Sequence, residues 1–171
     1  MSFFSRLFGT APDPMEELRP LWHAVVAEAR NPVWYRECGA ADTVEGRFDM
    51  ITNITAMAML RLESEPDLIP ASARLTELFA EDMEGQLRET GLGDPTLGKK
   101  MGKLMEAMGG RLGAYRESIP LGVDASAEVV ARNANLVDGH DAKPMAARLI
   151  ALNAQLAQVS REDLLAGKIA A

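Results

Sequence analysis

Apolar residues recur every three or four positions along nearly the whole chain. The clearest run lies between residues 95 and 119, where the apolar positions are Leu97, Met101, Leu104, Met105, Met108, Leu112, Tyr115 and Ile119. Such spacing places side chains on one face of an α-helix. No segment of useful length alternates apolar and polar residues as a β-strand does. The pattern therefore predicts an all-α protein, a single-domain bundle of about six to seven helices.

Proline, glycine and capping residues divide this pattern into separate helices. Expected helices cover residues 15–30, 44–65, 71–90, 94–119, 124–136 and 145–159, with a short aromatic segment at 33–38 and a last turn at 164–166. Asp13 and Asp94 each precede a proline, the order expected of an N-cap and the first helical residue. Asp42-Thr43-Val44-Glu45 resembles a capping box with Asp42 as the cap, and Ser72 is a candidate cap for the next helix.

The size and charge of the chain limit its class. With 171 residues it suits one domain, and we expect a flexible segment at residues 1–13 and a helical domain at residues 14–171. The net charge of -7 disfavours nucleic-acid binding by the whole surface. The single Cys38 forms no intrachain disulfide and is expected to be buried and inert. Since no apolar run is long enough to span a bilayer and no secretion signal is visible, we predict a cytoplasmic protein.

The N-terminal segment has an aromatic cluster of its own. Its members Phe3, Phe4, Leu7 and Phe8 fall on one helical face. One or two such turns can lie in a membrane interface, which would bring the protein to the periphery of the inner membrane. A frayed terminus that packs on the body accounts for the same residues. The sequence leaves both interpretations open.

No set of residues predicts catalysis, a metal or a cofactor. The segment from Gly93 to Lys99 fits the start of a phosphate-binding loop, but Lys100 replaces the hydroxyl residue that holds magnesium and no strand precedes it. The acidic side chains on one side of the helix expected at residues 71–90 are Glu77, Glu81 and Glu84. They lack the Glu-x-x-His units of di-metal helix bundles, so a solvated face explains them better.

Glycines form a second stripe along the helix expected at residues 94–119. Gly98, Gly102, Gly109 and Gly113 lie beside its apolar face, and Lys99 and Lys103 lie beyond them. Each glycine inside a helix costs about 1 kcal/mol relative to alanine. Close approach of another helix commonly offsets that cost. That helix is either the Ala-rich helix at residues 124–136 or a helix of a partner, and the sequence alone favours the first.

Short blocks in a fixed order carry a resemblance to a known family. The blocks are Ala29-Arg30-Asn31-Pro32, Trp34-Tyr35, Asp42-Thr43, Gly46-Arg47-Phe48-Asp49, Arg61-Leu62, Phe79, Asp82-Met83, Leu87-Arg88-Glu89-Thr90-Gly91, Gly98-Lys99-Lys100-Met101, Gly110-Arg111, Ala114-Tyr115 and Arg132-Asn133. Together they span most of the chain. With them the chain resembles the ubiquinol–cytochrome c chaperone family, whose mitochondrial members assist cytochrome b biogenesis, and the short chain without a transit peptide looks like a bacterial homologue.

The resemblance implies a non-enzymatic assembly factor for the respiratory chain. Such a factor holds newly made cytochrome b, or a related integral membrane subunit, before its partners and haem arrive. The residues expected to bind this client are Gly98, Lys99, Lys100, Met101, Gly102, Lys103, Met105, Gly109, Gly110, Arg111, Gly113 and Tyr115. Two alternatives remain: a small helical enzyme with a cavity around Trp34 and Tyr35, and a generic scaffold that binds a soluble protein.

Overall fold

The structure is a computed structural model that describes residues 14–89, 91 and 94–169. The helices are α1 (Pro14–Ala29), α2 (Pro32–Arg36), α3 (Val44–Glu63), α4 (Ile69–Glu89), α5 (Asp94–Ser118), α6 (Val123–Asn133), α7 (Lys143–Leu156) and α8 (Arg161–Leu165). Short 3-10 turns, η2 (Pro66–Leu68) and η3 (Ile119–Leu121), precede α4 and α6. The predicted all-α class is confirmed, since the described residues form no β-strand. The Asp13 cap and the aromatic cluster of residues 3–8 lie outside the described residues.

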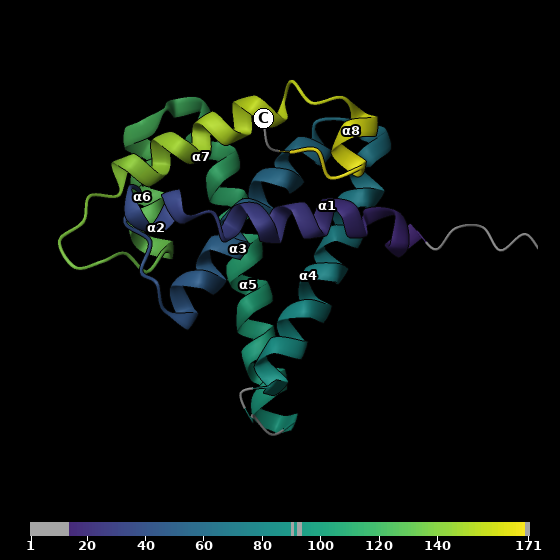
Figure 1. The fold of residues 1–171 in the computed structure, drawn as a ribbon, viewed down its shortest axis with the longest axis horizontal. Coiled ribbons are helices and arrows are strands. Elements are labelled where there is room, and N and C mark those ends of the chain that lie inside the picture. The colour runs from purple at the N-terminus through teal and green to yellow at the C-terminus, as the bar shows by residue number, and fades with distance from the viewer. Residues whose placement is uncertain (1–13, 90, 92–93, 170–171) are drawn as a thin grey trace, which may run out of the picture.

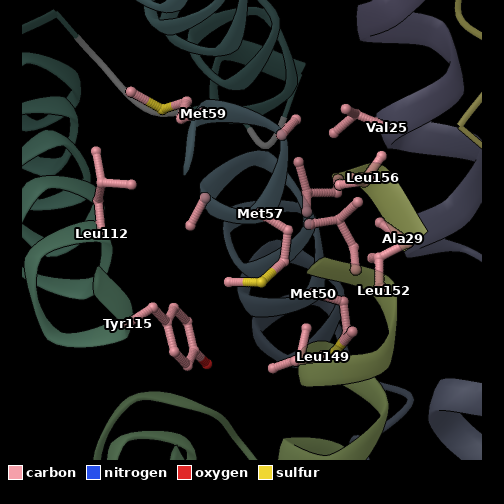
Figure 2. Packing of buried hydrophobic residues seen from close by; sticks show 14 of the residues in the cluster. Val25, Ala29, Met50, Met57, Met59, Leu112, Tyr115, Leu149, Leu152 and Leu156 are labelled. Carbon is pink, nitrogen blue, oxygen red and sulfur yellow. The ribbon is translucent and has the colours of Figure 1, made fainter. Parts of the chain in front are cut away.

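Helix α3 lies at the centre of the molecule. Every residue from Met50 to Met59 is buried, because α1, α4, α5 and α7 all pack against this helix. Figure 2 shows Met50 and Met57 of α3 among side chains of α1, α5 and α7. Its buried hydroxyls bond within the helix: Thr55 Oγ1 donates to the Ile51 carbonyl at 2.7 Å. The sequence predicted one apolar face for this helix, whereas the structure buries its middle on all sides.

Helices α4 and α5 run side by side away from the rest of the bundle (Figure 1). We call them the α4–α5 arm. The half of the arm nearest the bundle contributes Leu78, Phe79 and Tyr115 to the main core. Further out, Leu97 is buried although it lies outside that core cluster. The outer half of the arm therefore rests mainly on contacts between its own two helices.

Three predicted helix ends differ from the structure. The N-cap of α3 is Thr43, whose hydroxyl accepts from the Gly46 amide at 3.1 Å, while Asp42 pairs with Arg47 instead. Ser72 lies inside α4 rather than capping it, because η2 leads directly into Ile69. The helix expected at residues 124–136 ends at Asn133. Residues beyond it pair with an earlier loop, where the Ala41 amide donates to the Asn135 carbonyl at 2.9 Å.

Candidate functional site

The glycine stripe of α5 is open. Gly98, Gly102, Gly109 and Gly113 fall within about 60° of one another around the helix axis, and we call these four residues the glycine strip. A Cβ atom added at any of them would meet no described atom within 4 Å. Helix α6 does contact α5, but on another side. The interpretation that a helix of this same domain fills the stripe, which the sequence alone favoured, is therefore wrong for the described chain.

A basic edge borders the glycine strip. Lys99, Lys100 and Lys103 are exposed, and none of them forms an ion pair with a described residue. Gly110 is also exposed, with open space where a side chain would stand. Lys99 and Lys103 lie beside backbone that carries no side chains, which favours close approach and negative charge, while Lys100 adds charge on the far side of the helix.

Methionines border the strip on its other side. Met101 and Met105 are half-buried and pack against the core. Met101 and Gly98 also line a hollow of about 290 Å³ between the two helices of the arm, where Glu84 and Arg88 form an ion pair of 2.8 Å on α4. The unbranched, polarizable Met side chain adapts to differently shaped partners. Counting about 100° per residue, the methionines, the glycine strip and then Lys99 and Lys103 follow one another around α5, whereas Lys100 lies nearly opposite the strip.

Arg111 and Tyr115 lie elsewhere. Both were expected on the client surface, yet Arg111 is 4% exposed and Tyr115 is fully buried. Counting about 100° per residue, they fall in the arc of the buried Leu97 and not in that of the glycines. Angular position alone identifies Tyr115 as buried, whereas Arg111 lies only about 20° from the exposed Lys100 and is distinguished by its burial in the structure. The structure therefore removes these two residues from the predicted surface.

The Arg111 guanidinium joins three helices instead. It donates to Asp49 Oδ1 at 2.9 Å, to Asn53 Oδ1 at 3.1 Å, to the Asp49 carbonyl at 3.1 Å and to the Asn133 carbonyl. Tyr115 donates to the same Asn53 oxygen at 3.0 Å. Burial raises the pKa of the Tyr115 phenol above its ordinary value. This network fixes α5 and the end of α6 against α3, so it positions the glycine strip without taking part in it.

Trp34 is a core residue, whereas Tyr35 lines a hollow at the surface. Trp34 is fully buried, and its indole nitrogen donates to the Glu28 carbonyl at 3.0 Å. Tyr35 lines a separate shallow hollow whose charged groups are mostly guanidiniums, which stay protonated and cannot act as acid–base catalysts. Burial raises the pKa of the Cys38 thiol, as expected of an inert cysteine.

Other candidate motifs take ordinary structural places. Gly98 and Lys99 lie inside α5 rather than in a loop, which rules out a phosphate-binding loop there. Within the part of the chain that the structure describes, no three His, Cys, Asp or Glu side chains gather as metal ligands would. None of the described helices is long and apolar enough to cross a membrane.

Comparison with known proteins tests the resemblance. The sequence model of the ubiquinol–cytochrome C chaperone family matches residues 36–171. The chain belongs to the ubiquinol–cytochrome c chaperone family. This ubiquinol–cytochrome c chaperone is also similar to the crystal structure of the Cbp3 homolog from Brucella abortus, with a TM-score of 0.76 and 29% sequence identity over 96% of this chain and 94% of that one. No curated protein matches the chain significantly. The family is one of chaperones, which supports assembly rather than catalysis.

Proposed function

We propose that this ubiquinol–cytochrome c chaperone holds a membrane subunit of the respiratory complex, cytochrome b, through the glycine side of α5. The observation that carries the proposal is the open glycine strip. The cost of glycine inside a helix, about 1 kcal/mol per residue, is not recovered by any contact in the described chain. A client helix that approaches the bare backbone would recover it through van der Waals packing, as small-residue interfaces do between membrane helices.

The dimensions and charge of the strip suit such a client. From Gly98 to Gly113 the strip runs for about 22 Å along the helix, most of the ~30 Å apolar length of a membrane helix. The flanking Met101 and Met105 supply adaptable apolar contact. Lys99, Lys100 and Lys103 match lipid headgroups or acidic loops at the end of a client helix. The surface proposed to bind the client therefore consists of Gly98, Lys99, Lys100, Met101, Gly102, Lys103, Met105, Gly109, Gly110 and Gly113.

The test fills the strip without disturbing the fold. Gly102→Leu with Gly109→Leu places two bulky side chains in open space, so the variant should fold at least as stably as the wild type, since leucine favours helix over glycine. In a strain lacking the native gene, capture of cytochrome b from detergent-solubilised membranes should fall more than about tenfold, because two overpacked contacts cost well over 1.4 kcal/mol. The amount of assembled complex should fall with it.

A matched control carries the same number of new leucines elsewhere on the arm. Gly85→Leu with Ala107→Leu uses an open glycine of α4 and an exposed residue on another side of α5. This control should capture cytochrome b normally. If the strip variant is folded and still assembles the complex as well as the control does, the strip is not the client site.

We further propose that the protein is cytoplasmic and that Phe3, Phe4, Leu7 and Phe8 give it a peripheral contact with the inner membrane. Four large apolar side chains beside Arg6 are suited to the interface between headgroups and acyl chains. Deleting residues 2–8 should reduce binding to neutral lipid vesicles. Unchanged vesicle binding would remove this contact from the proposal.

A further inference from the structure

Three arginines surround one hollow at the corner between α1 and α2. The hollow has a volume of about 240 Å³ and is lined by Arg30, Pro32, Tyr35, Arg36, Asp42 and Arg47. We call it the arginine corner. With three guanidiniums and one carboxylate, it is locally positive on a chain whose net charge is -7. Such a concentration of one charge in a hollow attracts anions.

An apolar hollow adjoins the arginine corner. Its volume is about 190 Å³, and it shares Arg30 and Arg47 with the first hollow. Its apolar lining consists of Val44, Phe48 and Ile51. Val44, at the start of α3, is 59% exposed, so its apolar side chain is open to solvent beside this hollow. The two arginines therefore stand between a polar and an apolar space.

The backbone that carries these arginines is well fixed. Asn31 caps α2 by accepting from the Val33 amide at 3.2 Å. The Tyr35 hydroxyl donates to the Ala29 carbonyl at 2.9 Å. Trp34 Nε1 donates to Glu28 Oε1 at 3.1 Å, which ties α2 to the end of α1. A ligand would meet a preformed frame, which lowers the entropic cost of binding.

The guanidiniums are available to a ligand. Arg30 and Arg36 are exposed and form no ion pair with any described residue. Arg47 pairs with Asp42 at 2.8 Å, but both side chains are largely solvated, at 58% and 62% exposure. Exposed pairs of this kind contribute little free energy and exchange partners readily. Burial raises the pKa of the Tyr35 phenol, and the nearby charges of Arg47 and Arg30 oppose that rise.

We propose that the arginine corner binds the phosphate group of an anionic phospholipid, with the apolar hollow receiving the glycerol and first acyl carbons. Guanidinium is a planar fork of donors that matches phosphate oxygens in bidentate pairs. A free phosphate would use the arginines but leave the apolar hollow empty, which is why the geometry favours the lipid. The site is separate from the glycine strip and does not depend on the proposed client.

The test uses the full chain with Arg30→Gln and Arg36→Gln, two exposed side chains whose loss removes no described hydrogen bond. The matched control is Arg74→Gln with Arg132→Gln, which makes the same change in net charge away from both hollows. The probes are phosphatidylcholine vesicles, with and without about one third phosphatidylglycerol, at low salt. Because the N-terminal aromatic residues and the lysines of α5 are present in both variants, the difference between the variants in the ratio of anionic to neutral vesicle binding reports Arg30 and Arg36.

The expected result is a loss of about 30-fold in that ratio for the corner variant, since each basic residue near an anionic surface contributes about fivefold. The control should keep most of the ratio. Equal ratios for the two variants would overturn the proposal. Inorganic phosphate at the same concentration as the phosphatidylglycerol tests the lipid assignment. Complete release of the protein from the vesicles by this phosphate would overturn that assignment in favour of a soluble phosphate. Normal cytochrome b capture by the corner variant would show that the two sites are independent.

Discussion

Replacing Arg111 by methionine should destabilise the fold strongly while leaving the client surface chemically unchanged. Only 5% of the Arg111 side chain is exposed, and its guanidinium satisfies oxygens of Asp49, Asn53 and Asn133. Methionine fills a similar volume but donates no hydrogen bond. The variant therefore leaves an Asp49 carboxylate, 18% exposed, without its cationic partner.

The magnitude follows from what remains. Removing one partner of a buried ion pair costs about 3–5 kcal/mol. Here Asp49 Oδ2 keeps two donors, the Asn135 amide at 2.9 Å and Asn135 Nδ2 at 2.7 Å. Asn53 Oδ1 keeps the Tyr115 hydroxyl. We therefore expect the low end, about 3 kcal/mol, which lowers Tm by about 6–12 °C for a chain of this length.

Urea unfolding followed by far-UV circular dichroism measures this cost. The control is Arg116→Met on the same helix, where Arg116 pairs with Glu63 of α3 at 2.6 Å with 54% and 27% of the two side chains exposed. That solvated pair should contribute about 0.5 kcal/mol. Adding Asp49→Leu to Arg111→Met should recover part of the loss, since an apolar pair replaces a broken ionic one. The reasoning is refuted if Arg111→Met loses no more free energy of unfolding than Arg116→Met.

Three further predictions concern other buried contacts. Folding raises the pKa of the Tyr115 phenol. The contribution of Tyr115 to the free energy of unfolding should therefore be constant below about pH 10 and fall by about 1.4 kcal/mol per pH unit above it. Tyr115→Phe should remove that part of the alkaline decline in urea unfolding. Gly39→Ala should destabilise by more than about 2 kcal/mol, because its backbone has φ +75° and the new Cβ would stand 1.8 Å from His140 Cδ2. Gly139→Ala, at a similar φ but in open space, should cost less. Ellman's reagent should label Cys38 only after unfolding, because the thiol is buried and its pKa is raised.

The helical class and the main helices were predictable because the apolar period of a helix is a local signal. The cap of α3 was predicted within one residue, Thr43 in place of Asp42, whereas the predicted cap Ser72 lies inside α4. The burial of α3 on all sides was not predictable in the same way. Thr52 and Thr55 are polar, yet each hydroxyl donates to a carbonyl four residues earlier and so needs no solvent. Intrahelical bonding of this kind leaves no trace in the hydrophobic pattern.

Whether another helix covers the glycine stripe also could not be predicted from the local sequence pattern. Its existence follows from spacing, but what covers it depends on contacts between segments distant in sequence. Helix α6 contacts α5 without covering the glycines. The burial of Arg111 was unpredictable for the same reason. An arginine next to glycines in the sequence suggests a basic surface, but its partners Asp49 and Asn53 lie on α3, about sixty residues away in the chain.

A comparison with another glycine of the chain shows that the fold itself does not require the glycines of the strip. At Gly46 an added Cβ would stand 2.0 Å from the Ala41 carbonyl oxygen, so close approach within the fold requires that glycine. Gly98, Gly102, Gly109, Gly110 and Gly113 meet no such neighbour among the described residues, although each costs about as much inside a helix. Alanine at all five positions would make the fold more stable. A contact that forms only when another molecule is present explains why a single helix carries them, and a helix of a membrane subunit has the shape to make it.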